Sequence, residues 1–150
     1  MNNEKYMKLA LQEAKKAMEK DEVPVGAVII KNGKVLARAY NQKETKKDAT
    51  KHAEIIAMNK AARKLNNWHL DDCIMYVTLE PCAMCAGAIM QSRIKKVVFG
   101  AYDAKGGSLY SCIQLYEIPG FNHYPLIEAG ILENECAKLL KDFFKTKRNP

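Results

Sequence analysis

The sequence predicts an α/β fold of three layers, with a central mixed sheet of about five strands and helices on both faces. Two observations predict this class. Near the start, two strand-like runs, residues 25–30 and 35–40, are separated by a short turn, and after them strand patterns alternate with helical patterns. Such alternation after an opening hairpin is typical of a mixed sheet that is covered by helices.

The first forty residues predict a helix and then the hairpin. An apolar stripe at helical spacing runs along the first helix, through Met7, Ala10, Leu11, Ala14, Ala17 and Met18. Between the two strands, Asn32-Gly33 is a dipeptide that favours a tight type I′ turn. The polar residues 41–51 then predict a loop.

The remaining elements are expected in the order helix, strand, helix, strand, strand and helix. They cover about residues 52–65, 74–79, 81 onward, 97–101, 124–129 and 136–143. Pro81 is expected to start the third helix, because proline prefers the first helical turn. The apolar face of the last helix is predicted to hold Cys136, Leu139, Leu140 and Phe143. Residues 103–123 carry no clear pattern.

The length of 150 residues predicts a single domain, residues 1–150, that folds without disulfides. No apolar run reaches the roughly 18 residues of a membrane helix, and the charged start lacks the apolar segment of a signal peptide. We therefore expect a cytoplasmic protein with no membrane partner. Three of the five cysteines are expected to be buried small apolar residues, namely Cys73, Cys112 and Cys136.

The other two cysteines belong to the most informative pattern in the chain. His52-Ala53-Glu54 is followed by Pro81-Cys82-Ala83-Met84-Cys85. One histidine and two cysteines give zinc three protein ligands and leave a fourth position open, which is the arrangement of a catalytic site. The joint pattern is the known signature of zinc nucleobase deaminases, so it predicts one zinc ion per chain.

The spacing of this motif constrains its geometry. Cys82 and Cys85 are three residues apart and share one face of a helix. His52 and Glu54 lie about 200° apart around a helix, so they converge only in its first turn. We therefore expect two helix N-termini to face each other across the metal.

Glu54 is the candidate catalytic residue, because hydrolysis of an amine needs one group that both accepts and donates a proton. The motif alone does not say which base is deaminated. His69 and His123 are expected not to be ligands, since no correlated partners accompany them. Trp68 and Tyr76 are expected to be structural.

The final helix concentrates positive charge in a chain of net charge +7. Its basic residues are Lys138, Lys141, Lys145, Lys147 and Arg148, and Phe143 and Phe144 lie between them. One phenylalanine is needed for the core, which leaves the other free to stack on a nucleotide, as in RNA recognition. The alternative is a helix with a merely solvated basic face, and charge alone leaves both interpretations open.

Beyond the zinc motif, the chain resembles the bacterial tRNA adenosine deaminases, a family of cytidine deaminase-like fold, over residues 4–148. The stretches that carry the resemblance are residues 23–28, 40–41, 52–54, 70–100, 103–105, 121–123 and 142–144. The resemblance implies conversion of the wobble adenosine of a tRNA anticodon to inosine, and a homodimer that binds the anticodon loop.

The resemblance also implies roles for particular residues. His52, Cys82 and Cys85 would bind zinc, and Glu54 would carry protons. The substrate would be contacted by Asn41, Ala53, Asn122, Phe144 and Arg148. Two segments depart from the family: residues 48–51 read Asp-Ala-Thr-Lys in place of Asp-Pro-Thr-Ala, and residues 106–111 differ from its small-residue run.

Two other functions compete with RNA editing. A deaminase of free nucleobases or nucleosides would use the same chemistry, and the basic final helix is the feature against it. A non-catalytic RNA-binding module held together by zinc would not need Glu54. Turnover of free bases separates the first from RNA editing, and release of ammonia separates both enzymes from the module.

Overall fold

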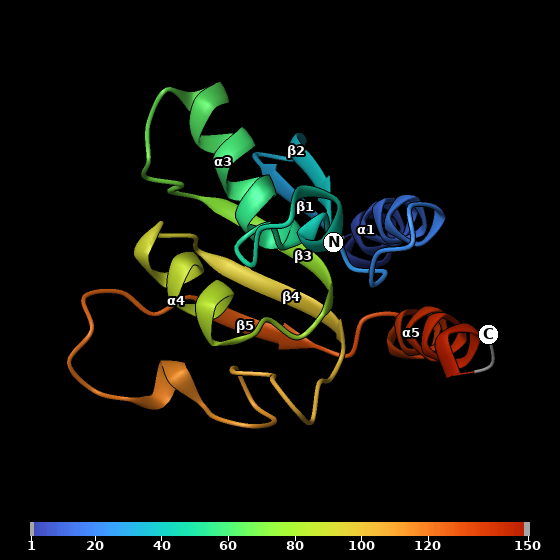
Figure 1. Ribbon diagram of the computed structural model, residues 1–150. Helices are drawn as coiled ribbons and strands as arrows, with labels where there is room; N and C mark the ends of the chain where they lie inside the picture. The colour runs from blue at the N-terminus through green and yellow to red at the C-terminus, as the bar shows by residue number, and fades with distance from the viewer. Residues whose placement is uncertain (1, 149–150) are drawn as a thin grey trace.

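The computed structural model of the protein describes residues 2–148, and its centre is a mixed sheet of five strands in the order β2-β1-β3-β4-β5 (Figure 1). The strands are β1 (Gly26–Lys31), β2 (Lys34–Tyr40), β3 (Cys73–Leu79), β4 (Lys96–Ala101) and β5 (Leu126–Ala129). The α-helices are α1 (Asn3–Glu19), α2 (Lys43–Lys46), α3 (Ala53–Leu65), α4 (Ala83–Gln91) and α5 (Glu133–Arg148), and a 3₁₀ turn, η1, covers Leu115–Glu117.

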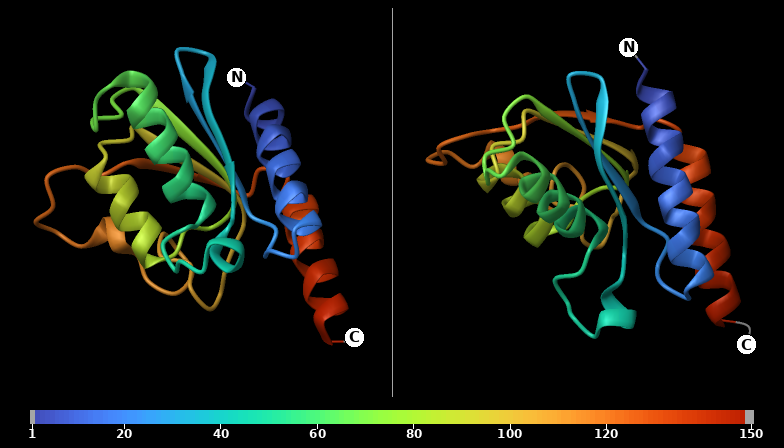
Figure 2. Two further views of the ribbon diagram at one scale, coloured as in Figure 1. Left: turned by 45° about the horizontal axis from the view of Figure 1, so that its top comes forward. Right: turned by 90° about the horizontal axis from the view of Figure 1, so that it is seen from above.

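The sheet lies between two layers of helices, so the predicted three-layer α/β/α class is confirmed. Helices α3 and α4 cover one face, and α1 and α5 run side by side on the other (Figures 1 and 2). Strand β1 is antiparallel to both β2 and β3, whereas β3, β4 and β5 are parallel. None of the helices in the described residues is long and apolar enough to cross a membrane.

The opening hairpin forms as its turn chemistry predicts. Asn32 and Gly33 have φ angles of 51° and 76°, which are the two positive values that a type I′ turn requires. The register shifts between Ile29 and Ile30, at a β-bulge. The hairpin places β2 at the edge of the sheet and β1 between β2 and β3.

Because successive side chains of a strand point to opposite faces of the sheet, the protein has two hydrophobic cores, one on each face. Met75 and Val77 of β3 belong to the cluster under α3 and α4, while Tyr76 between them belongs to the cluster under α1 and α5. Phe99 and Val98 divide in the same way on β4. Each such side chain, once buried, contributes about 1.5–3 kcal/mol of transfer free energy, and the two faces together fix the register of the sheet.

Helix α1 approaches the sheet closely. A Cβ atom on Gly26 would lie 2.0 Å from the carbonyl oxygen of Ala10, a backbone atom that cannot move aside. Only glycine allows α1 to pack at this distance from the start of β1. The tight contact fixes the segment that connects α1 to β1, which includes Val23 and Val25 of the site described below.

Four details differ from the sequence-based expectations. Residues 41–51 are not only loop, because Glu22 caps the short helix α2. Helix α4 begins at Ala83, since the residue after Pro81 is still extended. Cys112 is exposed, because it lies in an irregular segment with no strand or helix to bury it. Trp68 is 58% exposed, as it lies in the turn after α3.

Candidate metal centre and pocket

Two helix N-termini meet at the candidate site, as the motif spacing predicts. His52 is the N-cap of α3 and Cys82 is the N-cap of α4, and both have extended backbones with ψ angles of 153° and 176°. Neither side chain caps its own helix. Both are therefore free to point out of the helix ends toward each other.

The three motif ligands form a compact cluster. The Nδ1 atom of His52 lies 3.7 Å from the Sγ atom of Cys82 and 3.5 Å from that of Cys85. A nitrogen and a sulfur at zinc bond lengths of about 2.0 and 2.3 Å around a tetrahedral centre lie about 3.5 Å apart. The cluster therefore fits a zinc ion, and among the described residues it is the group that could hold a metal.

The electrostatics of the cluster favour a thiolate. The pKa of Cys82 is lowered to about 4, chiefly because the Cys85 thiol donates a hydrogen bond to it and because His52 does the same. The pKa of Cys85 is raised, because it shares its proton with the Cys82 sulfur and is buried. The N-terminal end of a helix adds to the preference for negative charge at such sulfurs. This is the donor set that a divalent metal prefers.

Glu54 lies beside the cluster and is almost fully buried. Burial raises the pKa of its carboxyl to about 7, against the smaller lowering effect of its backbone hydrogen bond and of His52. A carboxyl group with a pKa near neutral both accepts and releases a proton readily. Its position and its pKa suit the proton-transfer role that the motif predicts.

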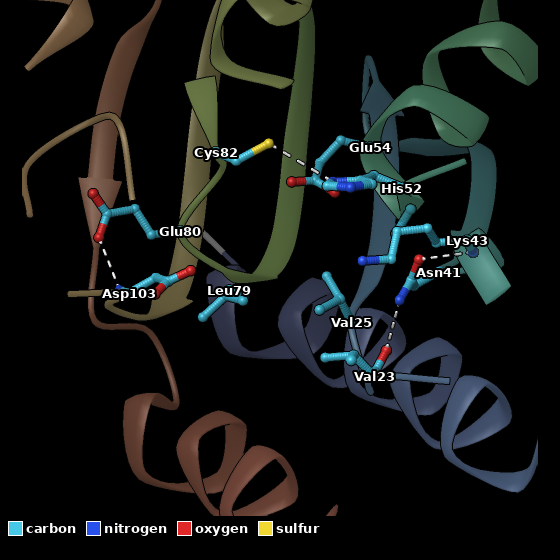
Figure 3. A pocket seen from close by; sticks show the side chains of 11 residues that line it. Val23, Val25, Asn41, Lys43, His52, Glu54, Leu79, Glu80, Cys82 and Asp103 are labelled. Carbon is cyan, nitrogen blue, oxygen red and sulfur yellow. Dashed lines mark hydrogen bonds between the residues drawn. The ribbon is translucent and has the colours of Figure 1, made fainter. Parts of the chain in front are cut away.

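His52, Glu54 and Cys82 line a pocket of about 150 Å³ (Figure 3). Pockets that hold drug-sized ligands have volumes of about 300–1,000 Å³, so this one admits only a small group. Ala53, His52, Glu54 and Cys82 line it from the two helix ends. A flat ring fits this space better than a whole nucleotide does.

One side of the pocket is formed by Asn41 and Lys43 together with Val23 and Val25 (Figure 3). The Nδ2 atom of Asn41 donates to the carbonyl of Val23, and its Oδ1 atom accepts from the backbone amide of Lys43. Asn41, which the family resemblance assigns to the substrate, is thus held rigidly at the pocket.

The opposite side is formed by Leu79, Glu80 and Asp103 (Figure 3). Glu80 is buried, and its pKa is lowered despite that burial, because Ser111, Tyr110 and Asp103 donate hydrogen bonds to its carboxylate. Sequence reasoning missed the roles of Lys43, Glu80 and Asp103. The one available signal was an acidic residue directly before Pro81.

The other predicted substrate residues lie outside the pocket. Asn122 is exposed between η1 and β5, and Phe144 is exposed on α5. Phe143 is buried, so the two phenylalanines divide between core and surface as predicted. Arg148 ends α5, and its side chain lies outside the described part of the chain. His123 binds the carbonyl of Ile94 at 2.7 Å and takes no part in the metal cluster.

Comparisons with known sequences identify deaminases, the class of enzyme that the His52, Cys82 and Cys85 motif predicts. The family model of MafB19-like deaminases matches residues 1–148. A tRNA-specific adenosine deaminase of Bacillus subtilis (strain 168) is 48% identical over 146 residues, which cover 97% of this chain and 91% of the relative. One of Aquifex aeolicus (strain VF5) is 48% identical over 149 residues, which cover 99% of this chain and 98% of the relative.

Solved structures give the same result. A structure from a study of A-to-I editing by tRNA:A34 deaminases has a TM-score of 0.88 and 43% identity, and covers 91% of this chain and 99% of that chain. A guanine deaminase of Bacillus subtilis has a TM-score of 0.66 and 32% identity, and covers 100% of this chain and 96% of that chain. The chain belongs to the MafB19-like deaminase family and, within it, to the tRNA-specific adenosine deaminases.

The cluster predicts how single substitutions change metal content. Cys85→Ala removes one of three ligands, so we expect purified protein with close to no zinc by mass spectrometry of the metal. Glu54→Gln removes no ligand and should keep about one zinc ion per chain, as should the control Cys112→Ala, whose cysteine is exposed elsewhere. Full zinc content in Cys85→Ala would contradict this ligand set.

Proposed function

We propose that the protein hydrolyses adenosine to inosine at the wobble position of a tRNA anticodon. The observation that carries the proposal is the pocket itself: a cluster of three zinc-type ligands, two of which (His52 and Cys82) line the pocket, lies beside a buried carboxyl of pKa about 7 at a space that admits little more than one base. The high identity to tRNA-specific adenosine deaminases supports adenosine in tRNA as the substrate.

His52, Cys82 and Cys85 would hold one zinc ion per chain. When bound, zinc lowers the pKa of a coordinated water toward 7 and makes it nucleophilic at neutral pH. Glu54 takes a proton from the attacking water and gives it to the ring nitrogen next to C6 of the adenine. The water oxygen forms a bond to C6. Glu54 then takes the second proton from this oxygen and gives it to the exocyclic nitrogen, so that the bond from C6 to that nitrogen breaks, ammonia leaves and the oxygen remains as the C6 carbonyl of inosine.

The small pocket requires the base to leave its stack. Asn41 and Ala53 would contact the base inside the pocket, while Asn122, Phe144 and Arg148 would contact the RNA outside it. Flipping costs least where a base is already unpaired, as in an anticodon loop. A tRNA-modifying enzyme acts where tRNA is found, which for this chain we propose to be the cytoplasm.

Deamination of free guanine is the competing function, because a guanine deaminase shares 32% identity with the chain. The decisive experiment incubates the protein with transcribed tRNAs that carry adenosine at the wobble position and reads A-to-G changes by sequencing. Parallel reactions with free guanine, adenosine and cytosine measure ammonia release. Editing of tRNA with poor turnover of free bases supports the proposal, and efficient turnover of a free base without editing replaces it.

Glu54→Gln is expected to lower the editing rate by about 10²–10⁴-fold, the usual contribution of a general acid and base. The amide keeps the size of the side chain but has no carboxyl proton to exchange. Single-turnover kinetics on a wobble-adenosine tRNA measure the effect on protein of matched zinc content. A rate within threefold of the unmodified enzyme would exclude Glu54 as the proton carrier.

Phe144→Ala is expected to weaken RNA binding without changing zinc content. Phe144 is 42% exposed, and loss of one stacked base costs about 1–3 kcal/mol, or roughly 5- to 150-fold in Kd. Phe143→Ala is the matched control, because its buried ring should affect thermal stability first. Fluorescence anisotropy with a labelled anticodon stem-loop gives both affinities, and equal RNA affinity of Phe144→Ala and the unmodified protein would contradict the stacking role.

We further propose a homodimer. Large exposed apolar residues gather in one stretch of chain that ends on the edge strand β5, at Ile113, Ile118, Phe121, Tyr124 and Leu126. Exposed apolar surface of this kind is typical of contact surfaces between proteins. Sedimentation at micromolar concentration should give twice the chain mass, and a fully active monomer would refute the dimer.

A further inference from the structure

We propose that Glu80 is a positioning residue that fixes the segment 102–111 as one wall of the pocket and so holds the base in the reactive orientation. The proposal rests on the proposed function for its catalytic consequence. Glu80 itself lies outside the zinc motif, and its carboxylate binds no motif residue.

Five hydrogen bonds converge on the two oxygens of this buried carboxylate. Its Oε2 atom accepts from the backbone amides of Leu109, Tyr110 and Ser111 at 3.2, 2.8 and 2.9 Å. Its Oε1 atom accepts from the amide of Asp103 at 3.0 Å and from the hydroxyl of Ser111 at 2.5 Å. Every partner is a donor, so the group acts only as an acceptor. An irregular segment is thereby ordered around one side chain.

Segment 102–111 is attached to the sheet through Glu80. The backbone amide of Glu80 donates to the carbonyl of Ala101 at the end of β4, at 2.8 Å. The amide of Ser108 donates to the carbonyl of Pro81, also at 2.8 Å. Glu80 thus connects the segment to β4 and to the residues that lead into α4, whose N-cap is Cys82 and whose first turn contains Cys85.

The Glu80 carboxylate lies so close to Gly107 that no side chain fits at position 107. A Cβ atom on Gly107 would lie 2.3 Å from the carboxylate carbon of Glu80. The φ angle of Gly107 is not in the left-handed region, so the backbone alone does not require glycine there. The same Cβ atom would lie 2.6 Å from the backbone carbonyl oxygen of Asp103, so space for the Glu80 carboxylate and for this carbonyl is the reason for glycine at this position.

Asp103 is the link from Glu80 to the pocket. Its amide is bonded to Glu80, and its own carboxylate accepts from the amides of Lys105 and Gly106 at 3.1 and 3.3 Å. Its side chain lines the pocket opposite Asn41 and Lys43 (Figure 3). A shift of the segment would therefore move the wall against which the base lies. Misplacement of a reactant by about 1 Å costs on the order of 10²-fold in rate.

Glu80→Gln tests the proposal selectively. The Gln carbonyl must face the three amides of residues 109–111, because an NH₂ group there would meet only donors. The NH₂ group then faces Asp103, whose amide loses its acceptor, while the Ser111 hydroxyl can turn and accept. The substitution therefore releases Asp103 and leaves the rest of the cluster bonded.

We expect Glu80→Gln to lower kcat about tenfold or more, with RNA Kd within threefold and zinc content unchanged. Hydrogen exchange of the Asp103 amide should become faster, which is measured without any substrate. The matched control is Glu13→Gln, another buried glutamate, whose carboxylate binds Lys16 on α1 away from the pocket. It should change none of these quantities beyond its effect on thermal stability.

Gly107→Ala gives an independent test if Glu80→Gln fails to fold, because its Cβ atom displaces the Glu80 carboxylate while keeping its charge, and it also displaces the Asp103 carbonyl of the same segment. It should reproduce the loss of kcat at constant Kd. Unchanged exchange at Asp103, an unchanged kcat, or equal losses in Glu80→Gln and Glu13→Gln would each overturn the proposal. If the unmodified protein does not edit tRNA, the proposed function fails, and faster exchange at Asp103 still shows that Glu80 holds the segment.

Discussion

The meeting of two helix N-termini is the constraint on which the site depends. Helices α3 and α4 lie on the same face of the sheet, and their N-caps, His52 and Cys82, keep extended backbones that leave the side chains free. Both helix dipoles point their positive ends at one place, which favours thiolate over thiol. The contact between Met75, Val77 and the helices above them holds this convergence in place.

Three buried carboxyl groups near the pocket differ in how many hydrogen bonds they accept, and this difference decides their chemistry. Glu22 and Glu80 accept bonds from backbone amides and hydroxyls, which lower the pKa of each in spite of burial. Burial dominates at Glu54, where hydrogen bonding is weaker, and raises its pKa to about 7. The two satisfied groups therefore act as fixed anchors for the pocket walls, and the third is left to exchange protons.

Features that depend on local sequence could be predicted, and features that depend on distant partners could not. The Asn32-Gly33 turn and the stripe on α1 follow from periodicity and turn chemistry, and the cluster of His52 with the two cysteines follows from spacing. The role of Glu80 depends on amides about thirty residues away in a segment without periodicity. Cys112 lies in that same segment and is exposed, so the prediction that it is buried was wrong.

The size of the pocket divides recognition between two parts of the molecule. A space of about 150 Å³ can select a base but cannot bind enough of an RNA to compensate for the few kcal/mol that unstacking costs. That free energy must come from contacts outside the pocket, where a net charge of +7 attracts phosphates. On α5, Lys138 and Lys147 are paired with Asp142 and Asp21 at the exposed surface. Exposed pairs of this kind contribute little to stability, so under the proposed RNA binding a phosphate would replace the carboxylate at small cost.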